Sequence, residues 1–321
     1  MKNLDYAYCV ARLRANESYM LNKAFMLKLC ESRDLDSALS SLTEVGWISE
    51  KGGIKDIISR KNKELWLLLN ECVPDKKELE IFCVLNDFFN IKAAVKCTFT
   101  GAEPYDYYLY PSSVSLGKLT EKVRLHDFSS LKLRGADTAE KAYRTALLTE
   151  NGQSAEIIID RGAVDCLCEY ATEKKSGLAN DICGFLCDTA NIKTALRINA
   201  LGKNRDFAEE AIGNCFKLDR KNLIKLALGE KEELYGYLSS TEYSEGAALY
   251  GESAALYEKW CDDEVIKRVF SARYTAFGFD PVCAFYYGKQ SEIKSVNLIL
   301  TALQAGVPAD EIKERIRLSY V

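Results

Sequence analysis

Two glycine–lysine pairs have the residue types of a phosphate-binding loop. In such a loop, backbone N–H groups and the lysine hold phosphate oxygens, and another glycine stands five residues before the pair. Ser112 stands at that position before Gly117-Lys118, and Arg197 stands there before Gly202-Lys203. The sequence therefore predicts a nucleotide site at neither pair.

The cysteines and the single histidine could in principle hold a metal or act as a catalytic base. Cys166-Leu-Cys168 and Cys183-Gly-Phe-Leu-Cys187 could supply four thiolates, but their spacing matches no standard zinc site, and they are predicted to pack as small apolar side chains. His126 lies in a polar stretch and is predicted to be solvated. G-x-S-x-G and G-x-G-x-x-G motifs are absent from the sequence. We predict no catalytic, cofactor-binding or metal-ligating residues and no cofactor.

A short polar motif occurs three times at a constant spacing. Asn90-Ile-Lys92 is repeated as Asn191-Ile-Lys193 and, more loosely, as Glu292-Ile-Lys294, so that the copies at 90, 191 and 292 are 101 residues apart. Apolar residues recur around the first two copies at i, i+3, i+4 and i+7, which is typical of a half-buried helix. The third copy has polar residues at Gln290 and Asn297. Each copy is predicted to be an inward-facing helix.

The motif side chains are predicted to have structural roles. The asparagines precede a buried isoleucine and should lie at the border between core and exterior, where their amides can bridge to a neighbouring helix or its cap. The lysines fall on the other flank, where their stems can cover apolar surface while the ammonium stays in water. The residues concerned are Asn90, Lys92, Asn191, Lys193, Glu292 and Lys294.

The repeat predicts the domain organisation. Solenoid repeats span roughly 20–50 residues, whereas this period is long enough for each unit to hold its own core. We predict an all-α fold of three similar helical domains, residues 1–105, 106–204 and 205–321, in a pseudo-threefold arrangement. Helices are predicted at residues 19–30, 37–45, 55–72, 75–97, 138–149, 153–172, 176–200, 207–215, 220–227, 247–276 and 284–305, with a final helix after Pro308 and a crossover loop at 100–117.

Composition is that of an ordinary globular chain. It has 321 residues, 48% of them hydrophobic and 28% charged, and no run approaches the roughly 18 apolar residues that cross a bilayer. Met1–Asp5 lack the apolar core of a signal peptide, so we expect a cytosolic protein whose 12 cysteines stay reduced. With a net charge of −4, the chain has no overall positive potential that would attract the phosphate backbone of a nucleic acid. Nucleic acid is therefore not a predicted partner.

Three segments together resemble a known family. The opening Tyr6-Ala-Tyr-Cys-Val-Ala-Arg-Leu-Arg-Ala15, the repeated Asn-Ile-Lys helix and the ending Gly306–Val321 are similar to the C subunit of the archaeal and bacterial V/A-type ATPases, the counterpart of the eukaryotic d subunit. The resemblance covers the whole chain. The cysteine content and Glu292 at the third asparagine position are departures from the family's pattern.

The resemblance implies a funnel-shaped, non-catalytic subunit of the central rotor. Such a protein lies peripherally on the cytoplasmic face of the membrane, with its wide end on the proteolipid rotor ring and the central shaft in the funnel. It couples ring to shaft during ATP-linked proton or sodium transport and has no membrane span.

Arg12 and Arg14 are the predicted partner contacts. They are two residues apart, so on a helix they cannot share one face, and one can anchor the fold while the other reaches outward. Each is expected to have a carboxylate or carbonyl partner, because an unpaired buried arginine would be too costly. Two alternatives remain open at this point: a soluble helical adaptor unconnected with a rotor, and an enzyme that uses only carboxylates and lysine.

Overall fold

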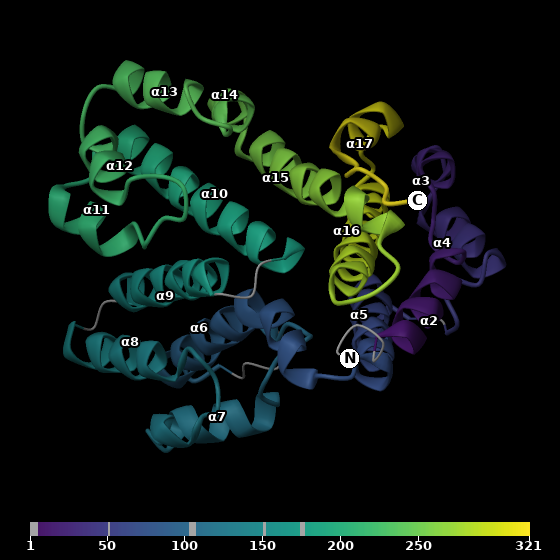
Figure 1. Cartoon of the computed structure of the whole chain (residues 1–321), viewed down its shortest axis with the longest axis horizontal. Helices are drawn as coiled ribbons and strands as arrows, with labels where there is room; N and C mark the ends of the chain where they lie inside the picture. The colour runs from purple at the N-terminus through teal and green to yellow at the C-terminus, as the bar shows by residue number, and fades with distance from the viewer. Residues whose placement is uncertain (1–5, 51, 103–106, 150–151, 174–176) are drawn as a thin grey trace. The chain divides into compact units, whose positions relative to one another are not determined.

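The computed structural model describes residues 6–50, 52–102, 107–149, 152–173 and 177–321, and within these ranges it contains helices and no strands (Figure 1). The all-α prediction is confirmed. The helices are α2 (Ala7–Glu17), α3 (Lys23–Cys30), α4 (Leu35–Glu44), α5 (Ile54–Cys72), η1 (Lys76–Phe82), α6 (Val84–Thr100), α7 (Leu116–Arg124), η3 (Phe128–Ser130), α8 (Ala136–Thr149), α9 (Gly152–Thr172), α10 (Leu178–Leu201), α11 (Arg205–Ala211), α12 (Arg220–Ala227), α13 (Lys231–Ser239), α14 (Ser244–Glu252), α15 (Ala254–Val269), η4 (Phe270–Tyr274), α16 (Asp280–Gln304) and α17 (Ala309–Arg315).

Contacts divide the chain into two compact units. Unit 1 combines the two ends of the chain, Met1–Lys76 and Leu249–Val321, and unit 2 is Lys77–Ala248. The predicted division into three domains rests on sequence similarity between repeats and not on contacts, so it stays a prediction. Its first boundary, at residues 105 and 106, lies outside the described residues, as do Met1–Asp5 and the start of the predicted helix at residue 176.

Unit 1 is built around α16. Helices α2, α3, α4 and α5 from the start of the chain pack against it, as do α15 and α17, and Figure 1 shows the N-terminal helices beside α16. Their shared core contains Leu29, Leu42 and Ile57 from the N-terminal part, together with Ile293 and Ile299 from α16. Burial of these side chains joins two segments that are more than 200 residues apart in the sequence, and each fully buried aliphatic side chain contributes about 1.5–3 kcal/mol.

Unit 2 is built around α9, which packs against α6, α8, α10 and α11. Its core includes Phe88 and Ile91 of α6 and Ile159 and Leu167 of α9. The isoleucine-rich run at residues 156–160 lies within α9, which confirms the helix predicted at residues 153–172. All twelve cysteines, every one of them in a described segment, are free thiols.

Four predicted helices are shortened or interrupted in the structure, and most of the others differ from it by one to four residues at one or both ends. The helix predicted at residues 19–30 begins at Lys23, because Asn22 caps it by accepting a hydrogen bond from the N–H of Phe25 at 2.9 Å. The tract at 247–276 is interrupted at Ser253, whose side chain caps α15 by accepting from the N–H of Ala255 at 3.2 Å. Local side-chain caps thus separate segments that hydropathy alone had joined.

The other two of these four differences lie in unit 2. The helix predicted at 75–97 splits into η1 and α6, since the N–H of Cys83 bonds to the carbonyl of Glu80, three residues back, at 2.9 Å. The helix predicted at 207–215 ends at Ala211, because the N–H groups of the following loop bond to side chains of α10. Helices α2, α7 and α13 and the short helix η3 were not predicted, and the crossover loop at 100–117 is confirmed over its described residues between α6 and α7.

Candidate interaction site

The first motif helix holds the loop that follows it. On α6, the Asn90 side chain accepts a hydrogen bond from the Leu109 N–H at 2.7 Å and donates one to the Leu109 carbonyl at 2.9 Å. One turn earlier, Asp87 accepts from the Ser112 hydroxyl at 2.6 Å and from the Ser113 N–H at 2.9 Å. Two polar side chains therefore form hydrogen bonds with backbone groups of a loop that has no regular hydrogen-bond pattern of its own.

The second motif helix repeats this arrangement. On α10, Asn191 accepts from the Gly213 N–H at 2.9 Å and donates to the Asn214 carbonyl at 2.7 Å. Asp188, again three residues earlier, accepts from the N–H of Phe216 and from the N–H of Lys217, each at 2.8 Å. The hydroxyl of Tyr243 also donates to Asp188 at 2.8 Å. The Asp–Asn pair at i and i+3 is thus a clasp for the downstream loop in both copies.

The third motif helix binds a different part of the chain. Glu292 of α16 accepts from the Leu21 N–H at 2.7 Å and from the indole N–H of Trp47 at 2.7 Å. Lys289, which stands 101 residues after Asp188, pairs with the same carboxylate. We also call Glu292 a clasp, although it holds the N-terminal segment and not a downstream loop. Its longer side chain accepts hydrogen bonds from two separate segments at once.

The clasp residues are buried. Asn90 and Asn191 are each 1% exposed and Glu292 is 4% exposed, so the expectation that the asparagines lie at the border between core and exterior is wrong. The held loop covers that flank of the helix and removes it from water. Burial raises the pKa of the Asp87 carboxyl, and its hydrogen bonds from Ser112 and Ser113 oppose that rise.

The motif lysines lie toward the surface. Lys92 pairs with Asp160 of α9, and Lys294 pairs with Asp262 of α15 at 2.6 Å. Lys193 on α10 is half-buried. Sequence reasoning missed Asp87 and Asp188 as clasp residues, although both stand three positions before the motif asparagine and could have been found by that spacing.

The chemical groups singled out in the sequence are not assembled into a reactive site. Gly202 ends α10 with φ of +57°, and Gly117 lies inside α7, so neither forms a phosphate loop. Burial raises the pKa of the Cys166 and Cys183 thiols to about 12, which keeps them protonated and poor metal ligands. Exposed His126 contacts the Tyr143 hydroxyl. Across the described segments, no three His, Cys, Asp or Glu side chains form a group that could hold a metal ion.

Arg12 and Arg14 of α2 have different surroundings. Arg14 is directed inward: it donates to the Ala272 carbonyl at 2.8 Å and pairs with Glu17 at 2.7 Å. Arg12 lies on the surface and pairs with Glu71 of α5 at 2.5 Å. Each arginine therefore has the carboxylate or carbonyl partner that was expected.

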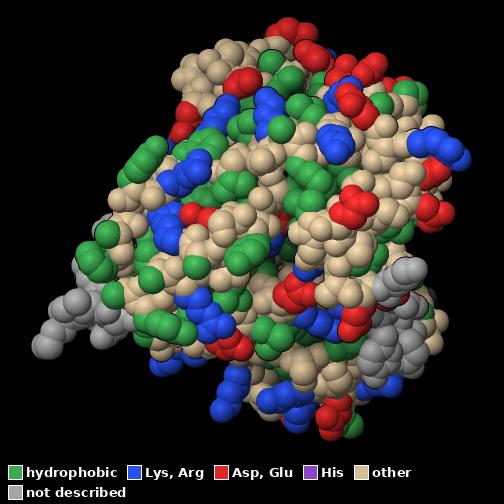
Figure 2. All heavy atoms as spheres, turned by 90° about the vertical axis from the view of Figure 1, so that its right-hand side faces the viewer, with side chains coloured by type: hydrophobic (Ala, Val, Ile, Leu, Met, Phe, Trp, Pro, Cys, Tyr) green, Lys and Arg blue, Asp and Glu red, His purple; other side chains and the backbone are tan. Residues whose placement is uncertain are grey.

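The side of α2 that carries Arg12 is unusually aromatic for an exposed surface. Tyr8, Arg12, Ala15 and Tyr19 follow the spacing i, i+4, i+7 and i+11, and we call them the outer face of α2. Tyr8 is 65% exposed, and Tyr19, just after the helix end, is 79% exposed. Tyrosine and arginine are enriched at protein interfaces and at their energetic centres. On the side of the molecule in Figure 2, hydrophobic, basic and acidic side chains are interspersed.

Comparison with known proteins now identifies the family. Residues 9–315 match the family described as ATP synthase (C/AC39) subunit. The chain belongs to this C/AC39 family. It is 23% identical to the C subunit of the V-type sodium ATPase of Enterococcus hirae, over 99% of both chains. It is 25% identical to the C subunit of the A-type ATP synthase of Methanocaldococcus jannaschii, over 96% of this chain and 85% of the relative. It is 24% identical to the same type of subunit from Methanosphaera stadtmanae, over 98% of this chain and 89% of the relative.

The match covers both compact units of this C/AC39 chain, including all three motif helices and most of α2. Within the described segments, none of the helices combines the length and the apolar character that crossing a bilayer requires.

Proposed function

We propose that this chain is a non-catalytic subunit of a rotary V/A-type ATPase that couples the membrane rotor ring to the central shaft during ATP-linked ion transport. The family match over residues 9–315 carries the proposal. The named relatives are the C subunits of a V-type sodium ATPase and of A-type ATP synthases, matched over most or all of their lengths. In this role the chain lies peripherally on the inner face of the membrane.

A coupling part must transmit torque without deforming, and the clasps suit that requirement. Asp87, Asn90, Asp188 and Asn191 tie loops to buried helices, and Glu292 ties the start of the chain to α16. Such bonds resist local opening because breaking them leaves buried polar groups unsatisfied. As part of this proposal we infer, from the family resemblance, three similar domains around a funnel, with the ring at the wide end and the shaft inside.

We place a partner contact on the outer face of α2. Arg12 and the two exposed tyrosines supply the contact, whereas Arg14 anchors α2 to η4 and is structural. The Arg12–Glu71 pair is exposed to solvent, so it contributes little to folding, and Arg12 is free to exchange this carboxylate for one on a partner.

Co-purification tests the proposal. The tagged chain should isolate ring and shaft subunits from membranes, and Arg12→Glu should reduce their recovery about tenfold without lowering the melting temperature. Arg205→Glu is the matched control, because Arg205 also forms an exposed ion pair, with Glu209 at 2.8 Å, but lies in unit 2. It should leave recovery unchanged.

One result would contradict the rotor assignment, and another would contradict only the placement of the interface. Recovery of soluble proteins alone, with neither ring nor shaft subunits, would favour the adaptor alternative. Normal assembly of the Arg12→Glu variant would remove the outer face of α2 from the interface while leaving the rotor assignment intact.

A further inference from the structure

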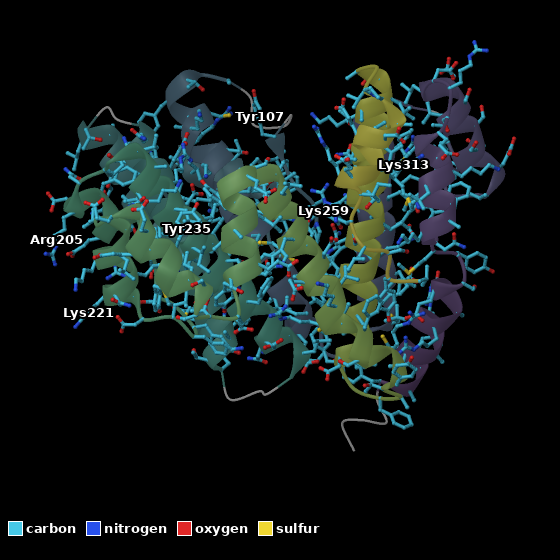
Figure 3. The ribbon with its side chains drawn as sticks, turned by 90° about the horizontal axis from the view of Figure 1, so that it is seen from above. Tyr107, Arg205, Lys221, Tyr235, Lys259 and Lys313 are labelled. Carbon is cyan, nitrogen blue, oxygen red and sulfur yellow. The ribbon has the colours of Figure 1, made fainter. Side chains whose placement is uncertain are left out.

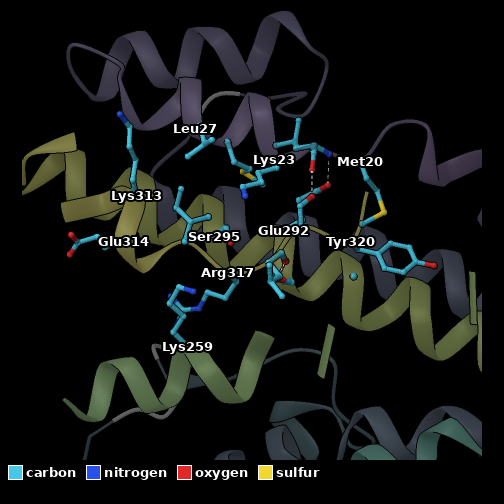
Figure 4. A pocket seen from close by; sticks show the side chains of 17 residues that line it. Met20, Lys23, Leu27, Lys259, Glu292, Ser295, Lys313, Glu314, Arg317 and Tyr320 are labelled. Atoms are coloured by element: carbon cyan, nitrogen blue, oxygen red, sulfur yellow. Dashed lines mark hydrogen bonds between the residues drawn. The ribbon is translucent and has the colours of Figure 1, made fainter. Parts of the chain in front are cut away.

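A cavity of about 200 Å³ lies within unit 1 and has no part in the proposed function. Its walls come from α3, α16 and the segment around and after α17, with Lys259 of α15 closing one side (Figure 4). Figure 3 shows Lys259 on α15 beside α16. Sites for drug-sized ligands usually enclose about 300–1,000 Å³, so this cavity suits a smaller molecule.

One of the cationic side chains that line the cavity forms no ion pair within the described part of the chain. Its cationic lining residues are Lys23, Lys259, Lys313 and Arg317. The last three are paired with carboxylates, at 2.7 Å to Asp263, 2.7 Å to Glu31 and 3.1 Å to Asp262 respectively. Lys23 is exposed where it lines the cavity, and its side chain has no ion-pair or hydrogen-bond partner among the residues that the structure describes. In Figure 4 its side chain is directed from α3 toward the space beside α16.

The acidic lining residues do not neutralise Lys23. The carboxylate of Glu292 is already engaged by Leu21, Trp47 and Lys289. Glu314 is exposed, and Figure 4 shows it at the far end of the site, pointing away from Lys23.

A serine hydroxyl that opens into the same cavity also has no hydrogen-bond partner within the described segments. Ser295 of α16 is 2% exposed, lines the cavity, and forms no side-chain hydrogen bond to any part of the chain that the structure describes. This hydroxyl keeps some accessible surface, since the fully buried side-chain oxygen without a partner in the described residues is that of Thr120, and it is therefore available to a ligand in the cavity. Lys23 is the first residue of α3, where the positive end of the helix dipole also disfavours a lysine. An anion bound here would relieve both conditions.

Apolar side chains form much of the remaining wall, with Ser291, Ser319 and Tyr320 also lining it; the apolar residues are Met20, Leu21, Met26, Leu27, Ile316 and Leu318. Because one positive charge is available beside an apolar surface, the matching ligand has one negative charge and a short hydrocarbon part. We propose that this cavity binds a small monocarboxylate with a short apolar chain, its carboxylate at Lys23 and Ser295 and its chain along the methionine and leucine side chains.

Calorimetry on the full chain tests this directly with isovalerate. The expected dissociation constant is roughly millimolar, because so few atoms limit the attainable affinity. Isovaleramide has the same shape without the charge, and acetate has the charge without the chain. Each should bind at least about tenfold more weakly, and equal binding of either one would overturn the proposal.

Variants locate the site. Lys23→Met should weaken isovalerate binding about tenfold, whereas Lys28→Met, at an exposed lysine on the same helix outside the cavity, should not. Ser295→Ala should weaken binding several-fold without lowering the melting temperature, since its hydroxyl has no bond to lose. No measurable heat with isovalerate, or unchanged binding by folded Lys23→Met, would refute the inference. Neither result bears on assembly with ring or shaft subunits, so the proposed function stands or falls separately.

Discussion

The Glu292 carboxylate accepts a hydrogen bond from the backbone N–H of Leu21 at 2.7 Å, across 271 residues of sequence. The same side chain accepts from the indole of Trp47 and pairs with Lys289. One buried carboxylate thereby connects α16 with the segment before α3 and with the turn after α4. It ties the start of the chain to the C-terminal part of unit 1.

Glu292→Ala should therefore destabilise unit 1 severely. Removing the carboxylate leaves the Leu21 N–H, the Trp47 N–H and the Lys289 ammonium without their acceptor, and breaking a buried ion pair costs about 3–5 kcal/mol. Denaturant unfolding measures the change. Glu314→Ala is the control, because Glu314 is exposed on α17 and should change the unfolding free energy by about 0.5 kcal/mol or less. Equal effects of the two substitutions would show that the Glu292 clasp contributes nothing.

Asn191→Ala should loosen the loop after α11. The buried Gly213 N–H loses its acceptor, at an expected cost of about 1–3 kcal/mol for a group left unsatisfied. The Asn214 carbonyl belongs to an exposed residue and keeps the Cys187 thiol as a donor, so the loss of the Asn191 donor adds little. Amide hydrogen exchange at Gly213 should accelerate before global unfolding. Asn297→Ala, on the exposed face of α16, should leave stability nearly unchanged. Unaltered exchange at Gly213 would contradict the clasp assignment.

Gly184→Ala should destabilise unit 2 despite the better helix propensity of alanine. A β-carbon at Gly184 would lie 2.2 Å from Cδ1 of Phe216, whose backbone N–H is held by Asp188, so the ring cannot withdraw freely. The matched control is Gly236→Ala in α13, where no atom lies within 4 Å of the added carbon. The control should gain about 0.5–1 kcal/mol, and thermal melts of both variants should shift in opposite directions.

Tyr320 should make the stability of unit 1 decline at alkaline pH. Burial raises the pKa of its phenol from 10.0 to about 12, the nearby Glu17 charge adds to the rise, and Arg14 opposes it. Since the folded pKa exceeds the unfolded one, the neutral phenol contributes stability that is fully present below pH 10 and is lost as the pH rises through about 12. Tyrosinate absorbance should show late-titrating groups, because burial also raises the pKa of Tyr108, Tyr110 and Tyr170, and Tyr320→Phe should remove one of them. Titration of all tyrosines together near pH 10 would contradict this.

Local sequence determined the helical fold and the recurrence of its motif, because apolar periodicity is a property of neighbouring residues. The structure confirms helices at residues 220–227 and around Asn90, Asn191 and Glu292. Residue chemistry was also sufficient to expect a partner for Arg12 and Arg14, since neither guanidinium is stable unpaired in a buried setting. The sequence could not show that Arg14 faces η4, because its acceptor at Ala272 is 258 residues away.

Only the tertiary structure decided what the motif side chains hold. Asn90 and Asn191 occur in the same sequence pattern on helices, yet their burial depends on loops that fold back over them. At the third copy no downstream loop takes that place in the described residues, and Glu292 binds the N-terminal segment. A hydrogen-bond partner contributed by a distant segment leaves no periodic trace in the sequence, because its position is set by chain packing and not by neighbouring residues.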